Sequence, residues 1–255
     1  MLRTLLNSQQ AGLLFVILLI GTILSLSAGD HVNRVTGEVV NNFLNSYTLM
    51  QTATDASFFV IMAVGATVVI ISGGIDLSVG AVYALAGVMT AMMLLAIGPE
   101  NPFVAVVLAL GMCVGIGVLC GLINGAMVVG LRVHPFIVTL GTMWIFRGVA
   151  FVTSKAESIL VPPSLTDVVK WSIGGDALYP MPMIIMLIIT AAGAIYLSRT
   201  VMGRHIFAVG GNVDASRYAG LRINRIVIGV YILSGLTAGI AAFVGISYYG
   251  SASCA

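Results

Sequence analysis

Long apolar segments separated by short polar ones dominate the chain. A membrane-spanning helix needs about 18 or more residues with few or no charges, and several segments are of this kind. Backbone groups find no water in hydrocarbon, so such segments must be helical. The pattern predicts seven spans, residues 11–29, 57–74, 79–97, 103–130, 136–152, 181–197 and 226–248. We therefore expect an all-α, polytopic transmembrane bundle forming a single domain, residues 1–255.

Two connecting segments and the first span need an interpretation. Apolar residues at three- and four-residue steps predict a helix in the membrane interface after the first span, at Val40, Phe43, Leu44, Tyr47 and Met50. Residues 153–180 are interrupted by proline and glycine and are predicted to be mostly loop. The first span also resembles a signal peptide, because Arg3 precedes it and S-L-S-A-G follows it. We favour a retained helix, since six spans follow.

The composition excludes a water-soluble globule. Hydrophobic residues make up 59% of the 255 residues and charged residues 8%, against about 25% charged residues in a typical soluble domain. The net charge of +2 comes with no basic block dense enough for a nucleic acid partner. Cys113 and Cys120 lie in one apolar segment without other metal-ligand residues, so we expect small buried packing residues.

The distribution of basic residues predicts the orientation. Cytoplasmic segments carry an excess of lysine and arginine. With the N-terminus in the cytoplasm, the inner segments hold seven such residues, Arg3, Arg132, Arg199, Arg204, Arg217, Arg222 and Arg225. The outer segments then hold three, Arg34, Lys155 and Lys170, and the acids Glu38 and Asp176 also fall outside.

The chain lacks the residues of several functional classes. It has no G-x-x-x-x-G-K-[ST] loop for ATP phosphates, no H-E-x-x-H and no G-x-S-x-G, so an enzyme is not expected. Ion-driven carriers usually bury ionisable residues within their spans. Here the predicted spans contain one charge, Arg147, which either reaches the interface or lines a polar path.

Two features of the spans have alternative interpretations. The fourth span carries Gly111, Gly115, Gly117, Gly121, Gly125 and Gly130. Small residues four apart allow close helix packing, and a hinge is the alternative. Between spans two and three, Gly73 and Gly74 are predicted to end a helix. Asp76 or Ser78 then either caps the next helix or contacts a polar substrate or a moving part. Because an acid at mid-bilayer costs about 2.5–3.5 kcal/mol, we expect Asp76 near the inner surface or in a wet cavity.

The inner segment, residues 199–225, holds a compact motif. Gly210 and Gly211 are predicted to form a flexible turn, and Asn212 to cap a short helix over residues 213–221. Ala215 and Ala219 would share one face of that helix. A rigid helix that presents small side chains on one face and is flanked by arginines suits docking to a soluble partner. A basic loop that only fixes the topology is the alternative.

Three motifs in this order resemble the permease subunits of bacterial ABC importers for simple sugars, the ribose/xylose/galactose group. They are G-G-I-D-L-S-V-G, which contains Gly73, Gly74, Asp76 and Ser78, then H-P-F-I-V-T-L-G-T-M-W-I-F-R-G, and finally G-R-x-x-x-A-x-G-G-N-x-x-A-S-R-x-x-G. The similarity runs from about Phe43 to the last residue. In that family, the residues matching the third motif belong to the loop that docks on the ATPase, here Gly203, Arg204, Ala208, Gly210, Asn212, Asp214, Ala215 and Gly220.

The resemblance implies a complete transport system around this chain. It implies an inner-membrane location, a second permease copy, cytoplasmic ATPase subunits that bind the ATP, and a periplasmic sugar-binding protein, with no cofactor on this chain. A neutral sugar would need hydroxyl partners such as Ser72, Ser78 and Thr142. Family members have about ten spans, so we expect this chain to be truncated at its C-terminus. An ion-coupled or facilitative secondary carrier and a non-transporting membrane scaffold are the alternatives.

Overall fold

The computed structural model describes residues 9–32, 39–170 and 179–254, and these are mostly helical, as predicted. The chain forms two compact units, which divide between Ala53 and Thr54. The single-domain prediction is not tested by this division. Four residues of the charge distribution, Arg3, Arg34, Glu38 and Asp176, lie outside the described residues.

The first unit contains α2 (Gln9–Ser27) and a short hairpin in which β1 (Asp30–Val32) pairs antiparallel with β2 (Val39–Asn41). The predicted interfacial helix from Val40 is wrong in its first half, because Val40 belongs to β2. The Asn41 amide Nδ2 donates to the Ser25 carbonyl at 2.9 Å, and its Oδ1 accepts from the backbone of Phe43. Asn45 Oδ1 then accepts from the Thr48 backbone N–H at 2.8 Å, where the next helix begins.

Within the described residues, six helices are long and apolar enough to cross a membrane. They are α3 (Ser46–Ile71), α4 (Val79–Ile97), α5 (Pro102–Leu131), α6 (Pro135–Ser154), α8 (Met181–Arg199) and α11 (Ile223–Tyr249). The first predicted span corresponds to a shorter apolar helix, Ala11–Ser27. The seven predicted segments are thus all helical. Because α3 begins at Ser46 and not at Ser57, it also carries Asp55.

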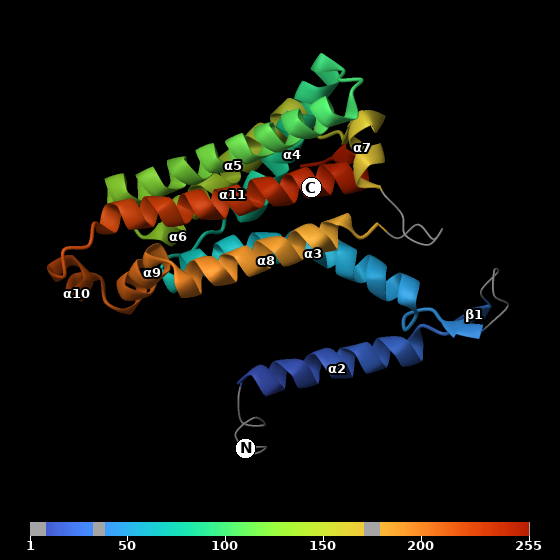
Figure 1. Ribbon diagram of the computed structural model, residues 1–255, viewed down its shortest axis with the longest axis horizontal. Coiled ribbons are helices and arrows are strands. Elements are labelled where there is room, and N and C mark those ends of the chain that lie inside the picture. Colours follow the sequence, from blue (N-terminus) through green and yellow to red (C-terminus); the bar gives the residue numbers. More distant parts are fainter. Residues whose placement is uncertain (1–8, 33–38, 171–178, 255) are drawn as a thin grey trace. The chain divides into compact units, whose positions relative to one another are not determined.

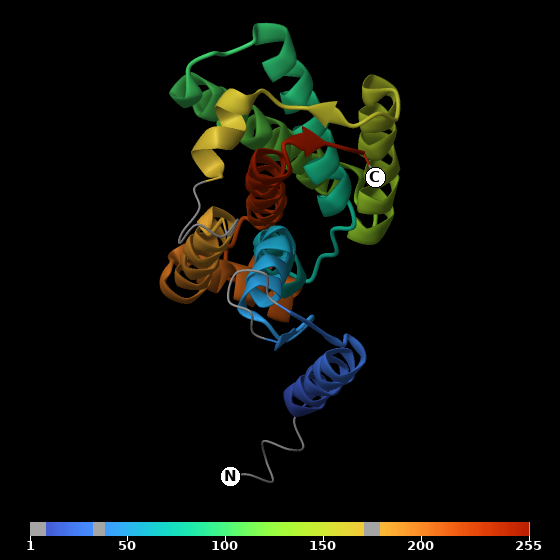
Figure 2. The same cartoon turned by 90° about the vertical axis from the view of Figure 1, so that its right-hand side faces the viewer.

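Helix α11 lies at the centre of the second unit, beside α5 and α4, while α6 packs against α4 (Figure 1; Figure 2). The predicted close packing of the glycine-rich span is confirmed. A Cβ on Gly117 would overlap the Gly235 carbonyl of α11, and one on Gly121 would overlap the Tyr231 carbonyl. Gly115 has nothing within 4 Å of its Cβ position, so only one face of α5 makes this contact. Cys113 and Cys120 are buried, as expected.

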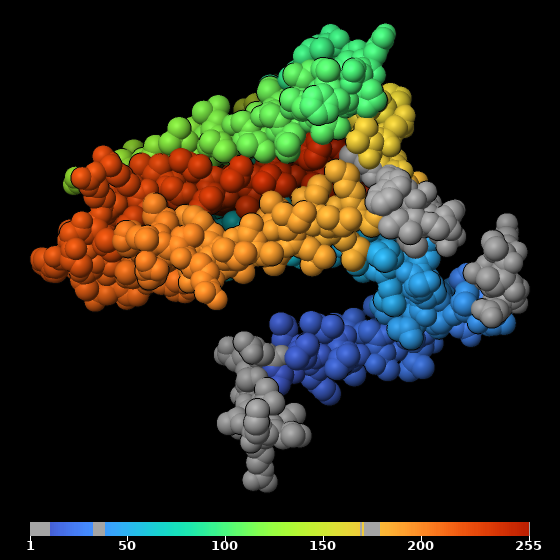
Figure 3. Space-filling model, in the orientation of Figure 1, coloured from blue at the N-terminus to red at the C-terminus, as the bar shows by residue number. Residues whose placement is uncertain are grey.

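The remaining elements are short. β3 (Ile159–Leu160) pairs with β4 (Ser251–Ala252), and α7 (Pro163–Val169) follows β3. The segment predicted to be mostly loop therefore contains a strand and a helix. Between α8 and α11, the chain forms α9 (Val201–Gly211) and α10 (Val213–Tyr218). Helix α8 lies on the surface of the second unit (Figure 3). Within its apolar stretch, 6% is buried inside the protein.

Candidate functional site

A sharp turn between α3 and α4 brings several polar side chains together. Helix α3 ends at Ile71, and Gly73 follows with a φ of 84°, a backbone conformation that glycine adopts without strain. The side chain of Tyr231 packs against the turn, so that a Cβ on Gly74 would lie 2.9 Å from the Tyr231 hydroxyl. The prediction that a helix ends at the two glycines is confirmed. We call residues 72–78 the α3–α4 corner.

Asp76 is held at this corner by hydrogen bonds to both carboxylate oxygens. Oδ1 accepts from the Ser78 backbone N–H at 2.9 Å and from the Ser78 hydroxyl at 2.6 Å. Oδ2 accepts from the Ser234 hydroxyl of α11 at 2.8 Å. The Asn124 amide of α5 donates to the Ser78 hydroxyl at 2.7 Å. We call Asp76, Ser78, Asn124 and Ser234 the Asp76 cluster.

The expectation that Asp76 lies near the inner surface or in a wet cavity stays a prediction, since the structure contains no membrane. Asp76 lies five residues after the end of α3 and three before the start of α4, while its partner Ser234 is eleven residues from the first residue of α11 and fifteen from the last. Hydrogen bonds to charged groups contribute about 1.5–3 kcal/mol each. Three such bonds are sufficient to offset the cost of about 2.5–3.5 kcal/mol for an acid at mid-bilayer. The hydrogen bonds of the Asp76 cluster therefore stabilise the carboxylate within an apolar helical bundle.

The capping prediction for this corner needs a correction. Ser78 is the N-cap residue of α4, but its side chain makes no capping hydrogen bond. Its hydroxyl instead donates to Asp76, and the carboxylate accepts from Ser78 itself and not from the first turn of α4. The cluster therefore ties the corner to α5 and α11 more than it stabilises the start of α4. Thr139 of α6 and Tyr231 of α11 add hydrogen bonds to the Ile75 carbonyl at 3.2 and 3.3 Å.

Helix α9 packs one face into the second unit. Gly203, Ile206 and Val209 recur at three-residue steps and are buried. The turn from α8 is tight, because a Cβ on Gly203 would overlap the Leu197 carbonyl, and Thr200 accepts from the Gly203 N–H at 3.0 Å. Arg204 and Ala208, on other faces, are exposed. The third motif therefore requires glycine at position 203, because a side chain there would overlap the Leu197 carbonyl.

Gly210 makes the contact that joins this segment to the corner. A Cβ on Gly210 would overlap the Ile71 carbonyl oxygen at the end of α3 and would lie 3.3 Å from the Ser72 carbonyl carbon. Gly211, the next residue, has nothing within 4 Å of its Cβ position. Both residues belong to α9, so the prediction of a flexible turn is wrong. Position 210 therefore requires glycine because no room remains for a side chain beside the Ile71 carbonyl.

Helix α10 projects from the second unit as a short exposed element (Figure 1). As predicted, Asn212 caps it, accepting from the Ala215 N–H at 2.9 Å; α10 ends at Tyr218, three residues before the predicted end. Asp214 and Arg217 form an exposed ion pair at 3.3 Å. Ala215 is exposed, and Gly220 has a φ of 82°, which suits the turn into α11. Among the side chains of α10, Tyr218 is 90% exposed and Ser216 is buried.

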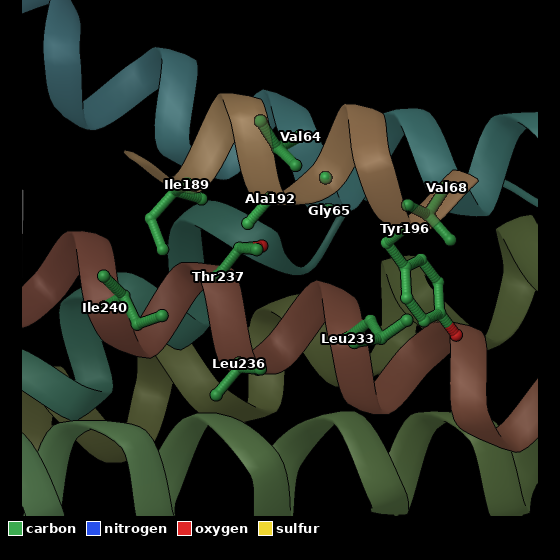
Figure 4. Close-up of a pocket in the computed structure, with 11 residues that line it drawn as sticks. Val64, Gly65, Val68, Ile189, Ala192, Tyr196, Leu233, Leu236, Thr237 and Ile240 are labelled. Atoms are coloured by element: carbon green, nitrogen blue, oxygen red, sulfur yellow. The ribbon is translucent and has the colours of Figure 1, made fainter. Parts of the chain in front are cut away.

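An apolar pocket of about 240 Å³ lies between α3, α8 and α11 (Figure 4). Its lining includes Val64, Leu233 and Ile240, with Tyr196 at one end. The Thr237 hydroxyl points into the pocket region but already donates to the Ser234 carbonyl at 2.9 Å. The wall offers few polar groups to a hydroxyl-rich solute.

Sequence reasoning missed several residues of the site. Asn124 and Ser234 are polar residues within apolar spans, which is the signal that could have indicated a buried cluster. Arg147 is exposed on α6, which leaves its role untested. Ser72 and Thr142 are buried and donate to carbonyls three residues earlier, those of Val69 in α3 and Thr139 in α6. No three His, Cys, Asp or Glu side chains gather as a metal-ligand set in the described residues.

The fold defines a multi-pass helical membrane protein. Residues 48–255 match the family described as branched-chain amino acid transport system / permease component. The chain belongs to this family of membrane permease components, which confirms the predicted resemblance.

Three relatives illustrate the similarity. The chain is 37% identical to the ribose import permease protein of Escherichia coli (strain K12), over 96% of this chain and 71% of that protein. It is 37% identical to the D-allose transport system permease protein of the same strain, over 82% of this chain and 62% of that protein. Identity to the autoinducer 2 import system permease protein of Photorhabdus laumondii is 31%, over 80% of this chain. The chain thus spans about three fifths of the latter two relatives' lengths. No solved structure matches the chain.

Proposed function

We propose that this chain is the membrane-spanning subunit of an ATP-driven importer that carries a monosaccharide across the bacterial inner membrane. Relatives named for ribose and D-allose import support the substrate class. The energy source would be a separate ATPase in the cytoplasm, and a periplasmic sugar-binding protein would deliver the solute. A second permease copy would complete the pathway. The excess of basic residues in the segments around α9 and α10 supports a cytoplasmic location for that end.

One observation carries the coupling mechanism. Gly210 of α9 contacts the carbonyl end of α3, directly before the corner that holds Asp76. A displacement of α9 therefore pushes on the corner, because packed interiors transmit strain. The corner in turn is hydrogen-bonded to α5 through Asn124 and to α11 through Ser234. In this proposal, closure of the ATPase moves α9 and α10, and the Asp76 cluster passes that movement to the central helices.

Helix α10 is the proposed docking element. It presents Val213, 42% exposed, and Tyr218, 90% exposed, beside the ion pair of Asp214 and Arg217. Tyrosine and arginine are enriched among residues that dominate binding energy at interfaces. Buried Ser216 and the cap by Asn212 hold the helix in place. A short, fixed element with an exposed aromatic residue suits a groove on a soluble partner.

The docking proposal is tested by co-purification with an ATPase encoded beside this chain. We expect Tyr218→Ala to reduce the amount of ATPase recovered, because an anchor residue typically contributes about 2 kcal/mol or more to an interface. Phe103→Ala is the matched control, since Phe103 is 75% exposed at the start of α5. Equal recovery with both variants would mean that α10 does not dock on the ATPase.

A further inference from the structure

A second cavity of about 240 Å³ lies at the end of the second unit where α11 ends. Its wall is formed by α4, by the last residues of α11 and by β4, through Tyr83, Ala84, Gly87, Ile246, Tyr249, Ser251, Ala252 and Ser253. Four residues of this wall carry hydroxyl groups, Tyr83, Tyr249, Ser251 and Ser253, against Tyr196 and Thr237 in the apolar pocket of Figure 4. Its volume lies just below the roughly 300–1,000 Å³ of pockets for drug-sized ligands, which suits a ligand as small as a single sugar ring.

Three hydroxyl groups of this wall are available to a ligand. The side-chain oxygens of Tyr83, Ser251 and Ser253 make no hydrogen bond within the part of the chain that the structure describes. The oxygens of Tyr83 and Ser251 are not among the fully buried atoms without a partner, and Ser253 is exposed. The Tyr83 and Ser251 oxygens are therefore not fully buried, and each of the three hydroxyls can both donate and accept.

The Tyr249 ring is held in place beside these hydroxyls. Its centroid lies 5.3 Å from that of Phe58 and 5.1 Å from that of Tyr248. Its hydroxyl donates to Asp55 Oδ1 at 3.1 Å. A ring fixed by packing and by a hydrogen bond loses little conformational entropy when a ligand binds. Tyr249 thus offers a preorganised aromatic wall, with Asp55 as its positioning residue.

Two glycines create the space for this arrangement. A Cβ on Gly245 would overlap the Tyr83 hydroxyl, so the tyrosine can occupy its position only with glycine there. A Cβ on Gly87 would lie 3.2 Å from Ile246 Cγ2, closer than ordinary packing allows. Gly245 and Gly87 therefore make room for Tyr83 and Ile246 in the wall of the cavity.

The geometry points to a binding subsite for one neutral monosaccharide, recognised by the hydroxyls of Tyr83, Ser251 and Ser253 and by the ring of Tyr249. No charged side chain lines the cavity among the described residues, which suits a neutral polyol. This inference rests on the proposed function. In the proposed orientation, the cavity opens on the outer side, where the solute would arrive.

The test measures binding of D-ribose and D-allose to the purified chain in lipid nanodiscs by ligand-observed NMR. We expect Tyr83→Phe and Ser251→Ala each to weaken binding roughly 2- to 10-fold, the effect of one neutral hydrogen bond. Tyr196→Phe is the control, because it removes a tyrosine hydroxyl at the apolar pocket. Thermal unfolding of every variant establishes that it is folded.

Each outcome decides the inference. Selective weakening by the two cavity variants supports it. Unchanged affinity in both, or an equal loss in Tyr196→Phe, overturns the subsite but leaves sugar import intact. Absence of sugar binding by the wild-type chain also overturns the subsite. The proposed function is tested separately by ATP-dependent sugar uptake. Uptake does not require that the chain bind sugar in the absence of ATP.

Discussion

Replacement of Gly210 by alanine tests whether α9 moves the α3–α4 corner. The new methyl group would overlap the Ile71 carbonyl oxygen, and the obstructing atoms belong to the backbone, which cannot rotate away. Non-bonded heavy atoms prefer separations of about 3.5–4.0 Å, so the end of α9 or of α3 must shift by roughly 2 Å. Overpacking of this kind costs about 1–3 kcal/mol. Neither Gly210 nor Gly211 has a positive φ, so alanine fits both backbones.

Gly211→Ala is the matched control. It adds the same methyl group one residue further along α9, into open space. Alanine favours helix over glycine by up to about 1 kcal/mol, so this variant should be as stable as wild type or slightly more stable. We expect Gly210→Ala to lower both the unfolding temperature and the sugar transported per ATP hydrolysed, with little effect from Gly211→Ala.

The assay combines thermal unfolding in nanodiscs with transport by vesicles that contain the ATPase partner. The reasoning would be refuted if the two variants had the same stability and the same transport per ATP. A loss of stability in Gly210→Ala with transport per ATP unchanged would support the contact but refute its role in coupling.

The remaining predictions concern helix packing, the Asp76 cluster and the α10 cap. Gly121→Ala should destabilise the chain by about 1–3 kcal/mol, because its Cβ would overlap the Tyr231 carbonyl; Gly115→Ala should not, and equal unfolding temperatures would contradict this. A double-mutant cycle of Asp76→Asn and Ser234→Ala should give a coupling free energy of about 1.5–3 kcal/mol, whereas strict additivity would mean that the hydrogen bond contributes nothing. Asn212→Ala should cost about 1 kcal/mol through loss of the cap and weaken ATPase recovery, and full recovery would contradict a role for the cap in docking.

The spans could be predicted because hydropathy alone determines them. A chain with 59% hydrophobic residues leaves few alternatives once the polar connections are marked. The start of α3 was missed because polar Thr54 and Asp55 interrupt the apolar pattern, although both lie within the helix. Helix α9 was missed because its buried face is short and two glycines end it, a composition more typical of a turn.

The candidate site could be predicted only in part. The glycines and Asp76 were identified, because a carboxylate beside two glycines is unusual in an apolar sequence. Their partners were not, because Asn124 and Ser234 are distant in sequence and only tertiary packing brings them to Ser78 and Asp76. The same reason explains why sequence alone gave no hint that Gly210 contacts Ile71.

The central claim is that energy for transport enters from a separate ATPase through α9 and α10. It is tested most directly by uptake of radiolabelled D-ribose and D-allose into vesicles containing this chain, an ABC ATPase partner and a sugar-binding protein. We predict accumulation of at least one of these sugars only with ATP on the ATPase side and with the ATPase present. Uptake by this chain alone, without ATP or partner, would contradict the account.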